Sequence, residues 1–166
     1  MSDPVSVHDV AASLISRARY GVLGSMALHK LAYYCQGWHL AWHGEPLFHD
    51  PVEARFRGMA IPALFPDSEG RPTLDSWPAG NSGALTASQN ETVRAVFAAY
   101  GGVVGRTMGE WQRNEAPWLM AHARATAETP YPEVRHDEMR AFFRAREDAP
   151  ATATDYANRF MANYVD

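Results

Sequence analysis

Residues 26–42 carry apolar side chains over most of a helical circumference, and this run constrains the fold more than any other part of the sequence. Two stripes at helical spacing make it up: Leu31, Tyr34, Cys35, Trp38 and Trp42, and then Met26, Lys30, Tyr33, Gly37 and Leu40. The polar residues share the remaining strip, namely His29, Gln36, His39 and His43. Ser25 stands at the expected N-cap and Gly44 just past the end. We therefore expect a central, buried helix whose polar strip, histidines included, is exposed.

The chain after this helix changes character. Residues 52–57, with the sequence Val-Glu-Ala-Arg-Phe-Arg, alternate between apolar and charged side chains, which is the period of a half-buried strand. Six prolines between positions 46 and 78 divide the rest into short pieces. We expect a small antiparallel β element near residues 52–57 and a short helical turn near 62–65. Residues 67–83 are expected to form an exposed loop in which Trp77 docks back on the body.

Helical patterns fill most of the remaining chain. Residue pairs with N-capping spacing precede three of the segments, namely Ser6 with Asp9, Thr86 with Gln89, and Thr152 with Asp155. We expect helices over residues 7–19, 86–100, 104–113, 117–125 and 137–146, and a last helix after 152 that carries Tyr156, Phe160 and Tyr164. The fold class is therefore mainly α (α+β), a helical domain around the central apolar helix. Residues 1–148 are expected to form the single domain, and 149–166 a helical extension that packs on it.

The charge balance limits the classes of partner. The chain has 15 basic and 19 acidic side chains and a net charge of −4. This charge balance argues against a general nucleic-acid-binding protein, which neutralises phosphates with a basic surface. It contains no apolar run of about 18 residues, so we expect no membrane partner. The acidic N-terminus leads no apolar segment, and Cys35 is a single cysteine. These features together predict a protein of the reducing cytoplasm.

Residue patterns that suggest catalysis are weak. His39 and His43 have the spacing of two metal ligands, but no Glu follows His39 as in zinc peptidases. Cys35 lies on the most apolar stripe of the central helix, where a cysteine acts as a small hydrophobe rather than a nucleophile. We expect no metal, no cofactor and no enzymatic activity. A small hydrolase that uses the histidines is the alternative.

Two tracts combine charged and aromatic residues more densely than an ordinary core requires. Lys30 is the only lysine among the 15 basic residues, and it lies in the tract of tyrosines and tryptophans of the central helix. The second tract is Glu-Ala-Pro-Trp at residues 115–118, where Glu115 precedes a predicted helix and can simply complement its dipole. Two alternatives are open for Lys30: it pairs with Glu53 or Glu115, because a buried ammonium group needs a partner, or it lines a binding groove together with Tyr33.

These tracts resemble a known family. Residues 26–41, M-A-L-H-K-L-A-Y-Y-C-Q-G-W-H-L-A, resemble the signature M-x-L-x-K-L-L-Y-Y-x-Q-G-W-H-L-A of the Panacea domain family. Similar blocks follow at residues 44–48, 52–54, 61–65 and 115–118, so that the resemblance covers about residues 5–143. The chain departs from the family at Gly58-Met59, where the family has Gly-Pro, and at Gln112-Arg113, where it has Thr-His.

What the resemblance implies is an antitoxin. The Panacea domain family includes phage-associated GepA-like proteins and SocA-like antitoxins, which neutralise a toxin encoded beside them by direct binding. SocA-like members also act as adaptors that present a toxin to a protease. The expected partners are accordingly a cognate protein toxin and a cytoplasmic protease. The residues expected to bind the partner or to support the binding surface are Lys30, Tyr33, Tyr34, Gln36, Trp38, Glu53, Gly58, Glu115, Pro117 and Trp118.

Overall fold

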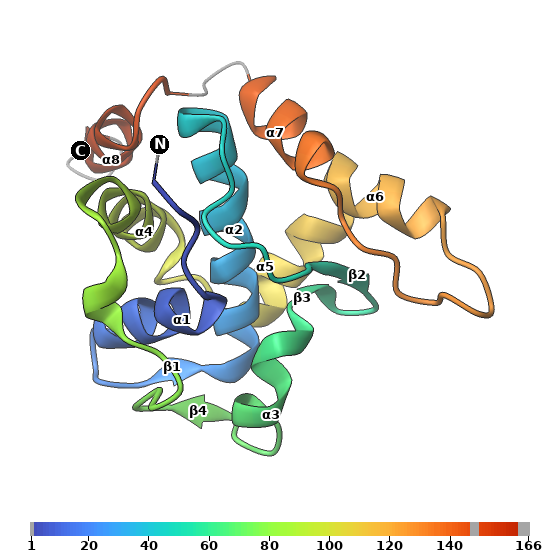
Figure 1. Cartoon of the computed structure of the whole chain (residues 1–166), viewed down its shortest axis with the longest axis horizontal. Helices are drawn as coiled ribbons and strands as arrows, with labels where there is room; N and C mark the ends of the chain where they lie inside the picture. Colours follow the sequence, from blue (N-terminus) through green and yellow to red (C-terminus); the bar gives the residue numbers. More distant parts are fainter. Residues whose placement is uncertain (1, 147–149, 163–166) are drawn as a thin grey trace.

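The computed structural model describes residues 2–146 and 150–162 (Figure 1). Helices dominate this part of the chain, as the sequence predicts, and their bounds are α1 Val7–Ser16, α2 Ser25–His43, α3 Phe65–Ser68, α4 Ala87–Tyr100, α5 Gly105–Arg113, α6 Ala116–Ala123, α7 His136–Arg144 and α8 Ala153–Ala162. Two short 3-10 helices lie at Pro62–Leu64 and Ser82–Ala84. The predicted fold class is thus confirmed.

Four short strands form two antiparallel pairs. Strands β2 (Glu53–Arg55) and β3 (Gly58–Ala60) form a hairpin in which Ala54 is opposite Met59. This is the β element expected near residues 52–57. A second pair, which the sequence does not predict, joins β1 (Leu23–Gly24) to β4 (Thr73–Leu74) and ties the start of α2 to the loop that follows α3.

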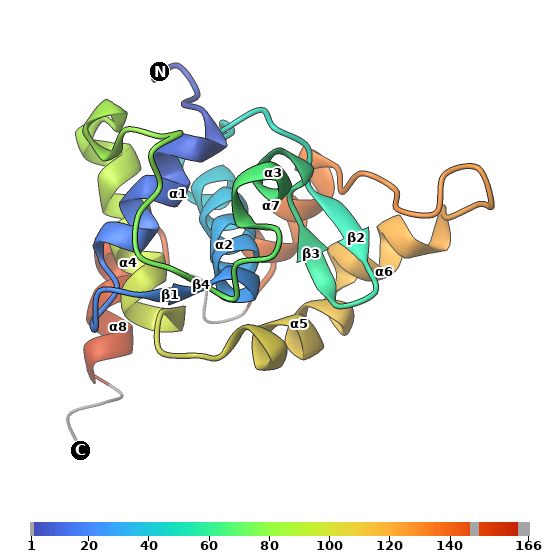
Figure 2. The ribbon, with the colours of Figure 1, turned by 90° about the horizontal axis from the view of Figure 1, so that it is seen from below.

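Helix α2 runs through the centre of the molecule, with α1, α4, α5 and α7 packed around it (Figures 1 and 2). Every residue from Ala27 to Leu40 is buried, including Leu31 and Trp38. Gly44 ends the helix with a positive φ of 73°, and its N–H donates to the Leu40 carbonyl. The prediction of a central helix is confirmed.

The expected exposure of the polar strip of α2 is wrong. His29, Gln36 and His39 are all buried, because each side chain holds a neighbouring segment by hydrogen bonds. Gln36 Nε2 donates to the Phe48 carbonyl at 2.6 Å, and its Oε1 accepts the Leu47 N–H at 2.8 Å. These three side chains therefore face neighbouring segments, a loop at Gln36 and helix α4 at His39, rather than water. Amphipathic patterning does not distinguish these two outcomes, since both need polar side chains on that side.

Helix ends differ from expectation at two places. Gly24, not Ser25, is the N-cap of α2, and the Ser25 hydroxyl donates instead to the Ser68 carbonyl. Helix α1 ends at Ser16 rather than near residue 19. The capping box of Thr86 and Gln89 at the start of α4 is present as predicted.

Two outlying segments are held against the body. Trp77, in the loop before α4, is buried, and its Nε1 donates to His8 Nδ1 at 3.1 Å, so the expected docking of Trp77 is confirmed. Helix α8 packs on α4, and its Tyr156 ring lies 4.6 Å from the Trp38 ring. The predicted boundary at residue 148 and Tyr164 lie outside the described residues. No helix in residues 2–146 or 150–162 is long and apolar enough to cross a membrane.

Gly37 tests how tightly α2 is enclosed. A Cβ at position 37 would collide with the buried ring of Phe143 on α7. We expect Gly37→Ala to lower the free energy of unfolding by about 2–4 kcal/mol, although alanine favours a helix by about 1 kcal/mol. Gly102→Ala is the control, because no atom lies within 4 Å of a Cβ there. Denaturant unfolding measures both, and equal effects would contradict the close packing of α2 and α7.

Candidate functional site

A cavity lined by two predicted site residues, Lys30 and Gly58, opens between the N-terminal half of α2, the β2–β3 hairpin and the loop after α3. We call it the Lys30 cavity, and its volume is about 770 Å³. Figure 2 shows the hairpin and α3 beside α2, with α5 running past the hairpin turn. The residues that line it are Ser25, Met26, His29, Lys30, Arg55, Arg57, Gly58, Ala60, Phe65, Ser68, Glu69, Gly70, Arg71 and Pro72.

Lys30 is held at the wall of this cavity. Its side chain is buried, with the residue 4% exposed, and Nζ donates to the Met59 carbonyl at 2.9 Å. Gln112 on α5 braces this contact, because its Oε1 accepts the Met59 N–H at 3.0 Å and its Nε2 donates to the Lys30 carbonyl at 3.3 Å. The hairpin, α2 and α5 thus meet at one buried ammonium group.

The expected pairing of Lys30 with Glu53 or Glu115 is wrong. Glu53 forms an ion pair with Arg55 at 2.7 Å, and Glu115 accepts the Tyr34 hydroxyl at 2.7 Å. Within the described residues, Lys30 has no carboxylate partner. Each carboxylate has a nearer donor, and the hairpin carbonyl takes the place expected for it.

Gly58 explains how a backbone carbonyl reaches Lys30. Its φ of 108° lies in the region that favours glycine, and a Cβ there would meet the Gly109 Cα at 2.8 Å. A Cβ on Gly109 would in turn collide with the Arg57 carbonyl. Glycine on both sides therefore allows the hairpin turn to pack directly on α5, which places Met59 over Lys30.

The surroundings of Lys30 are cationic. Burial, together with the positive charges of Arg113 and Arg57, lowers the pKa of Lys30 to about 8. Arg55 lies 4.8 Å from the Phe65 ring centroid and is neutralised by Glu53. Among the described lining residues, Glu69 supplies the one carboxylate. The cavity therefore carries an excess of positive charge.

His29, in the same wall, is a structural group. Its Nδ1 accepts the Ile61 N–H at 3.1 Å, so the proton of the neutral ring sits on Nε2, which faces the Ser68 hydroxyl at 3.3 Å. The hydroxyl itself donates to the Leu64 carbonyl. Burial, helped by the charges of Lys30 and Arg55, lowers the pKa of His29 to about 4. This hydrogen-bond polarity does not allow His29 to take the Ser68 proton.

A second, exposed hollow adjoins the Lys30 cavity along α5. We call it the α5 groove; its volume is about 410 Å³, and it is lined by Met26, Phe56, Arg57, Arg106, Glu110 and Arg113. Phe56 at the hairpin turn is 80% exposed, and Trp111 on α5 is 44% exposed. An aromatic ring at the hairpin tip and arginines along one helix form a surface typical of protein–protein contacts.

Tyr34 and Glu115 form a separate pocket on the other side of α5. The Tyr34 ring stacks on Tyr100 with centroids 4.1 Å apart, and both line a hollow of about 630 Å³ with Trp111. The second oxygen of Glu115 is buried without a hydrogen-bond partner in the described residues, and burial raises the pKa of this carboxyl. Glu115 is the N-cap of α6, but its side chain caps no N–H.

The other predicted residues lie within the framework. Trp38 is buried and donates from Nε1 to the Tyr100 hydroxyl, while Tyr33 is buried with no partner for its hydroxyl in the described residues. Pro117 is buried in the first turn of α6. Trp118 donates from Nε1 to the Arg55 carbonyl at 2.9 Å and so fixes α6 to the hairpin. None of these residues, nor Gln36, lines the Lys30 cavity or the α5 groove.

The weak catalytic candidates are placed as structural groups. His39 is buried, and its Nδ1 forms a hydrogen bond with the Thr92 hydroxyl at 2.8 Å. Cys35 is buried, and this burial raises the pKa of its thiol. No group of three or more His, Cys, Asp or Glu side chains is placed to hold a metal ion in the part of the chain that the structure describes.

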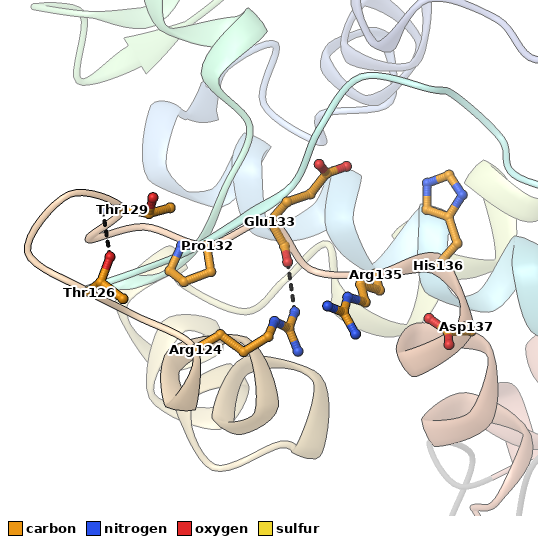
Figure 3. Close-up of a pocket in the computed structure, with 8 residues that line it drawn as sticks. All are labelled: Arg124, Thr126, Thr129, Pro132, Glu133, Arg135, His136 and Asp137. Carbon is orange, nitrogen blue, oxygen red and sulfur yellow. Dashed lines mark hydrogen bonds between the residues drawn. The ribbon is translucent and has the colours of Figure 1, made fainter.

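One more cavity, of about 650 Å³, lies under the loop that joins α6 to α7 (Figure 3). Arg124 reaches across it and donates to the Glu133 carbonyl at 2.9 Å and to the carboxylate of Glu138. The charge of Arg124 is therefore neutralised by Glu138 of α7. The Thr126 hydroxyl accepts the Thr129 N–H at 3.0 Å and closes the loop tip. No predicted site residue lines this cavity, and we assign a structural role to the residues that line it.

The sequence did not single out the arginines of the α5 groove or Phe56. The signal was present, because Arg55, Phe56 and Arg57 are consecutive, but the alternation was used only to predict a strand. Comparison of the chain with models of protein families, with curated protein sequences and with solved structures finds no significant match. Function must therefore be inferred from the residues and their geometry.

Lys30 gives a test of these electrostatics. Between pH 8 and about 10.5 the unfolded chain holds a proton that folded Lys30 has lost, so raising the pH through this window stabilises the fold, by up to roughly 3 kcal/mol. We expect Lys30→Met to remove this pH dependence and to leave stability at pH 7 unchanged or higher. Denaturant unfolding at pH 7 and pH 10 measures both. A loss of several kcal/mol at pH 7 would contradict the absence of a carboxylate partner.

Proposed function

We propose that this protein is an antitoxin related to the Panacea domain family, which neutralises a protein toxin from a neighbouring gene by direct binding. The proposal rests on the signature in residues 26–41 and on the blocks that follow it. It places the protein in the cytoplasm with the toxin and assigns it no catalytic activity and no cofactor. Delivery of the bound toxin to a protease is a further role that the family resemblance suggests.

The observation that supports this proposal best is the α5 groove. The protein has a net charge of −4, yet Arg57, Arg106 and Arg113 line this groove against a single carboxylate, Glu110. Arg106 Nε and Glu110 Oε1 are 3.6 Å apart on the exposed surface of α5. An exposed ion pair of this kind is weak, so much of the positive charge of the groove is left unbalanced. A partner that fits the groove therefore presents acidic side chains around an apolar centre that covers Phe56.

The signature residues have a supporting role in this proposal. Lys30 and Gly58 seat the hairpin on α5, and Trp118 ties the same hairpin to α6. These contacts fix the position of Phe56 and Arg57 at the hairpin turn, although Lys30, Gly58 and Trp118 do not themselves line the α5 groove. Rigid support of exposed anchors limits the conformational entropy lost on binding.

A hydrolase that uses histidines remains the alternative. The arrangement at His29 gives it little support, because the ring donates toward Ser68 instead of accepting its proton. His39 is engaged by Thr92 in the interior. The alternative predicts that buried histidines are needed for activity, whereas antitoxin action depends on the exposed groove.

Growth on co-expression tests the proposal. We expect the adjacent open reading frame to be toxic alone and harmless beside the wild-type chain. Phe56→Ala and Arg106→Glu should each weaken toxin binding roughly tenfold or more, because they remove an exposed anchor and reverse a steering charge. Both residues are exposed, so melting temperatures should change little. Affinity is measured by titration calorimetry.

Matched controls come from the turn after α1. Tyr20, which is 83% exposed, and Arg19 lie outside the groove, so Tyr20→Ala and Arg19→Glu should leave toxin binding unchanged. A harmless neighbouring gene, or one that stays lethal beside the wild-type chain, would show that the protein is not its antitoxin. Equal losses in the groove and control variants would refute the assigned surface alone.

A further inference from the structure

We propose that the Lys30 cavity is a binding site for a small phosphate monoester with an apolar body. This ligand is additional to the toxin, and the proposal does not depend on the proposed function. It rests on three features of the cavity: a buried ammonium group without a carboxylate partner in the described residues, arginine side chains that line the same cavity, and an apolar wall beside them.

The first feature is the hydrogen-bonding capacity left on Lys30. An ammonium group has three N–H donors, and within the described residues Nζ has one acceptor, the Met59 carbonyl. The residue is only 4% exposed and lines the cavity, so water reaches the remaining donors from that side alone. Burying a cation without a counter-ion is costly, and an anion in the cavity would relieve this cost.

The start of α2 lies beside the cavity but is not open to it. Ser25 and Met26, its first two residues, line the cavity. The Ser25 N–H donates to the Pro72 carbonyl at 2.9 Å, and the Ser25 hydroxyl donates to the Ser68 carbonyl. The second feature is therefore the set of side chains around Lys30 and not the end of the helix.

The side chains around this centre add to the positive charge. Arg57 lies at the mouth and contributes to the lowered pKa of Lys30. Arg71 also lines the cavity, although it donates to the Asp67 carbonyl and its Nη2 lies 4.0 Å from the Asp75 carboxylate at the surface. Arg55 is paired with Glu53, and Glu69 opposes the excess only in part. Donors on several sides suit a phosphate dianion, which has three terminal oxygens, better than a planar carboxylate.

The third feature sets the size and polarity of the ligand. The cavity of about 770 Å³ is far larger than an inorganic phosphate ion, and it falls in the range of small-molecule sites. Met26, Ala60, Phe65 and Pro72 form its apolar wall. A ligand that fills the site therefore carries an apolar or aromatic group next to its phosphate.

The single lysine makes a direct experiment available. Protein grown with 13C-labelled lysine gives one side-chain Cε signal, from Lys30. Phenyl phosphate is the probe, with phenylacetate and inorganic phosphate for comparison. We expect phenyl phosphate to shift the signal saturably, with a Kd of about 1 mM or tighter. It should also raise the titration midpoint of Lys30 from about 8 by roughly one pH unit or more.

Variants separate this site from binding elsewhere. Arg57→Gln keeps the label and should weaken phenyl phosphate binding at least tenfold, whereas Arg19→Gln should leave it unchanged. Lys30→Met should abolish the binding seen by calorimetry. An unshifted Lys30 signal, or equal affinity for phenylacetate, would overturn the proposal. So would equal losses in Arg57→Gln and Arg19→Gln. None of these outcomes bears on the toxin, since the experiment uses the antitoxin chain alone.

Discussion

The burial of α2 on all sides is the constraint on which the rest of the structure depends. A helix that is enclosed along Ala27 to Leu40 cannot send its polar side chains to water, so each must find a partner in a neighbouring segment. Gln36 holds the backbone at Leu47 and Phe48, and His29 holds the start of the 3-10 helix through the Ile61 N–H. The interior polar groups therefore arrange the loops, and the loops in turn form the walls of the Lys30 cavity.

Close backbone approach shapes the two hollows beside this core. Gly58 and Gly109 let the hairpin turn rest on α5, and that contact brings the Met59 carbonyl to Lys30 and leaves Phe56 standing free. Side chains at either glycine would push the two elements apart. The α5 groove and the Lys30 cavity thus share one structural origin, although they differ in chemistry: charged side chains form most of the lining of the α5 groove, whereas the Lys30 cavity also has an apolar wall.

The sequence predicted the elements well because local patterns carry them. The apolar circumference of residues 26–42, the alternation at 52–57 and the capping pair of Thr86 and Gln89 each have a local physical cause, and the structure contains all three. Partners across the fold were not predictable in this way. The acceptor for Lys30 is a backbone carbonyl, which has no signature in the sequence. The burial of His29 and His39 depends on which segments pack over α2, which are the chain around Ile61 and Ser68 for His29 and helix α4 for His39.

The same constraint explains why position 30 holds a lysine and not an arginine. All fourteen arginines carry a guanidinium that stays charged in proteins, and none of them is fully buried. Position 30 is buried and lacks a carboxylate partner in the described residues, so a permanent charge there would carry its full desolvation cost. A lysine can give up its proton when that cost is too high, and its pKa of about 8 shows how near this balance lies. The side chain at position 30 is therefore one whose charge responds to what occupies the cavity, and an arginine in its place would lose that response.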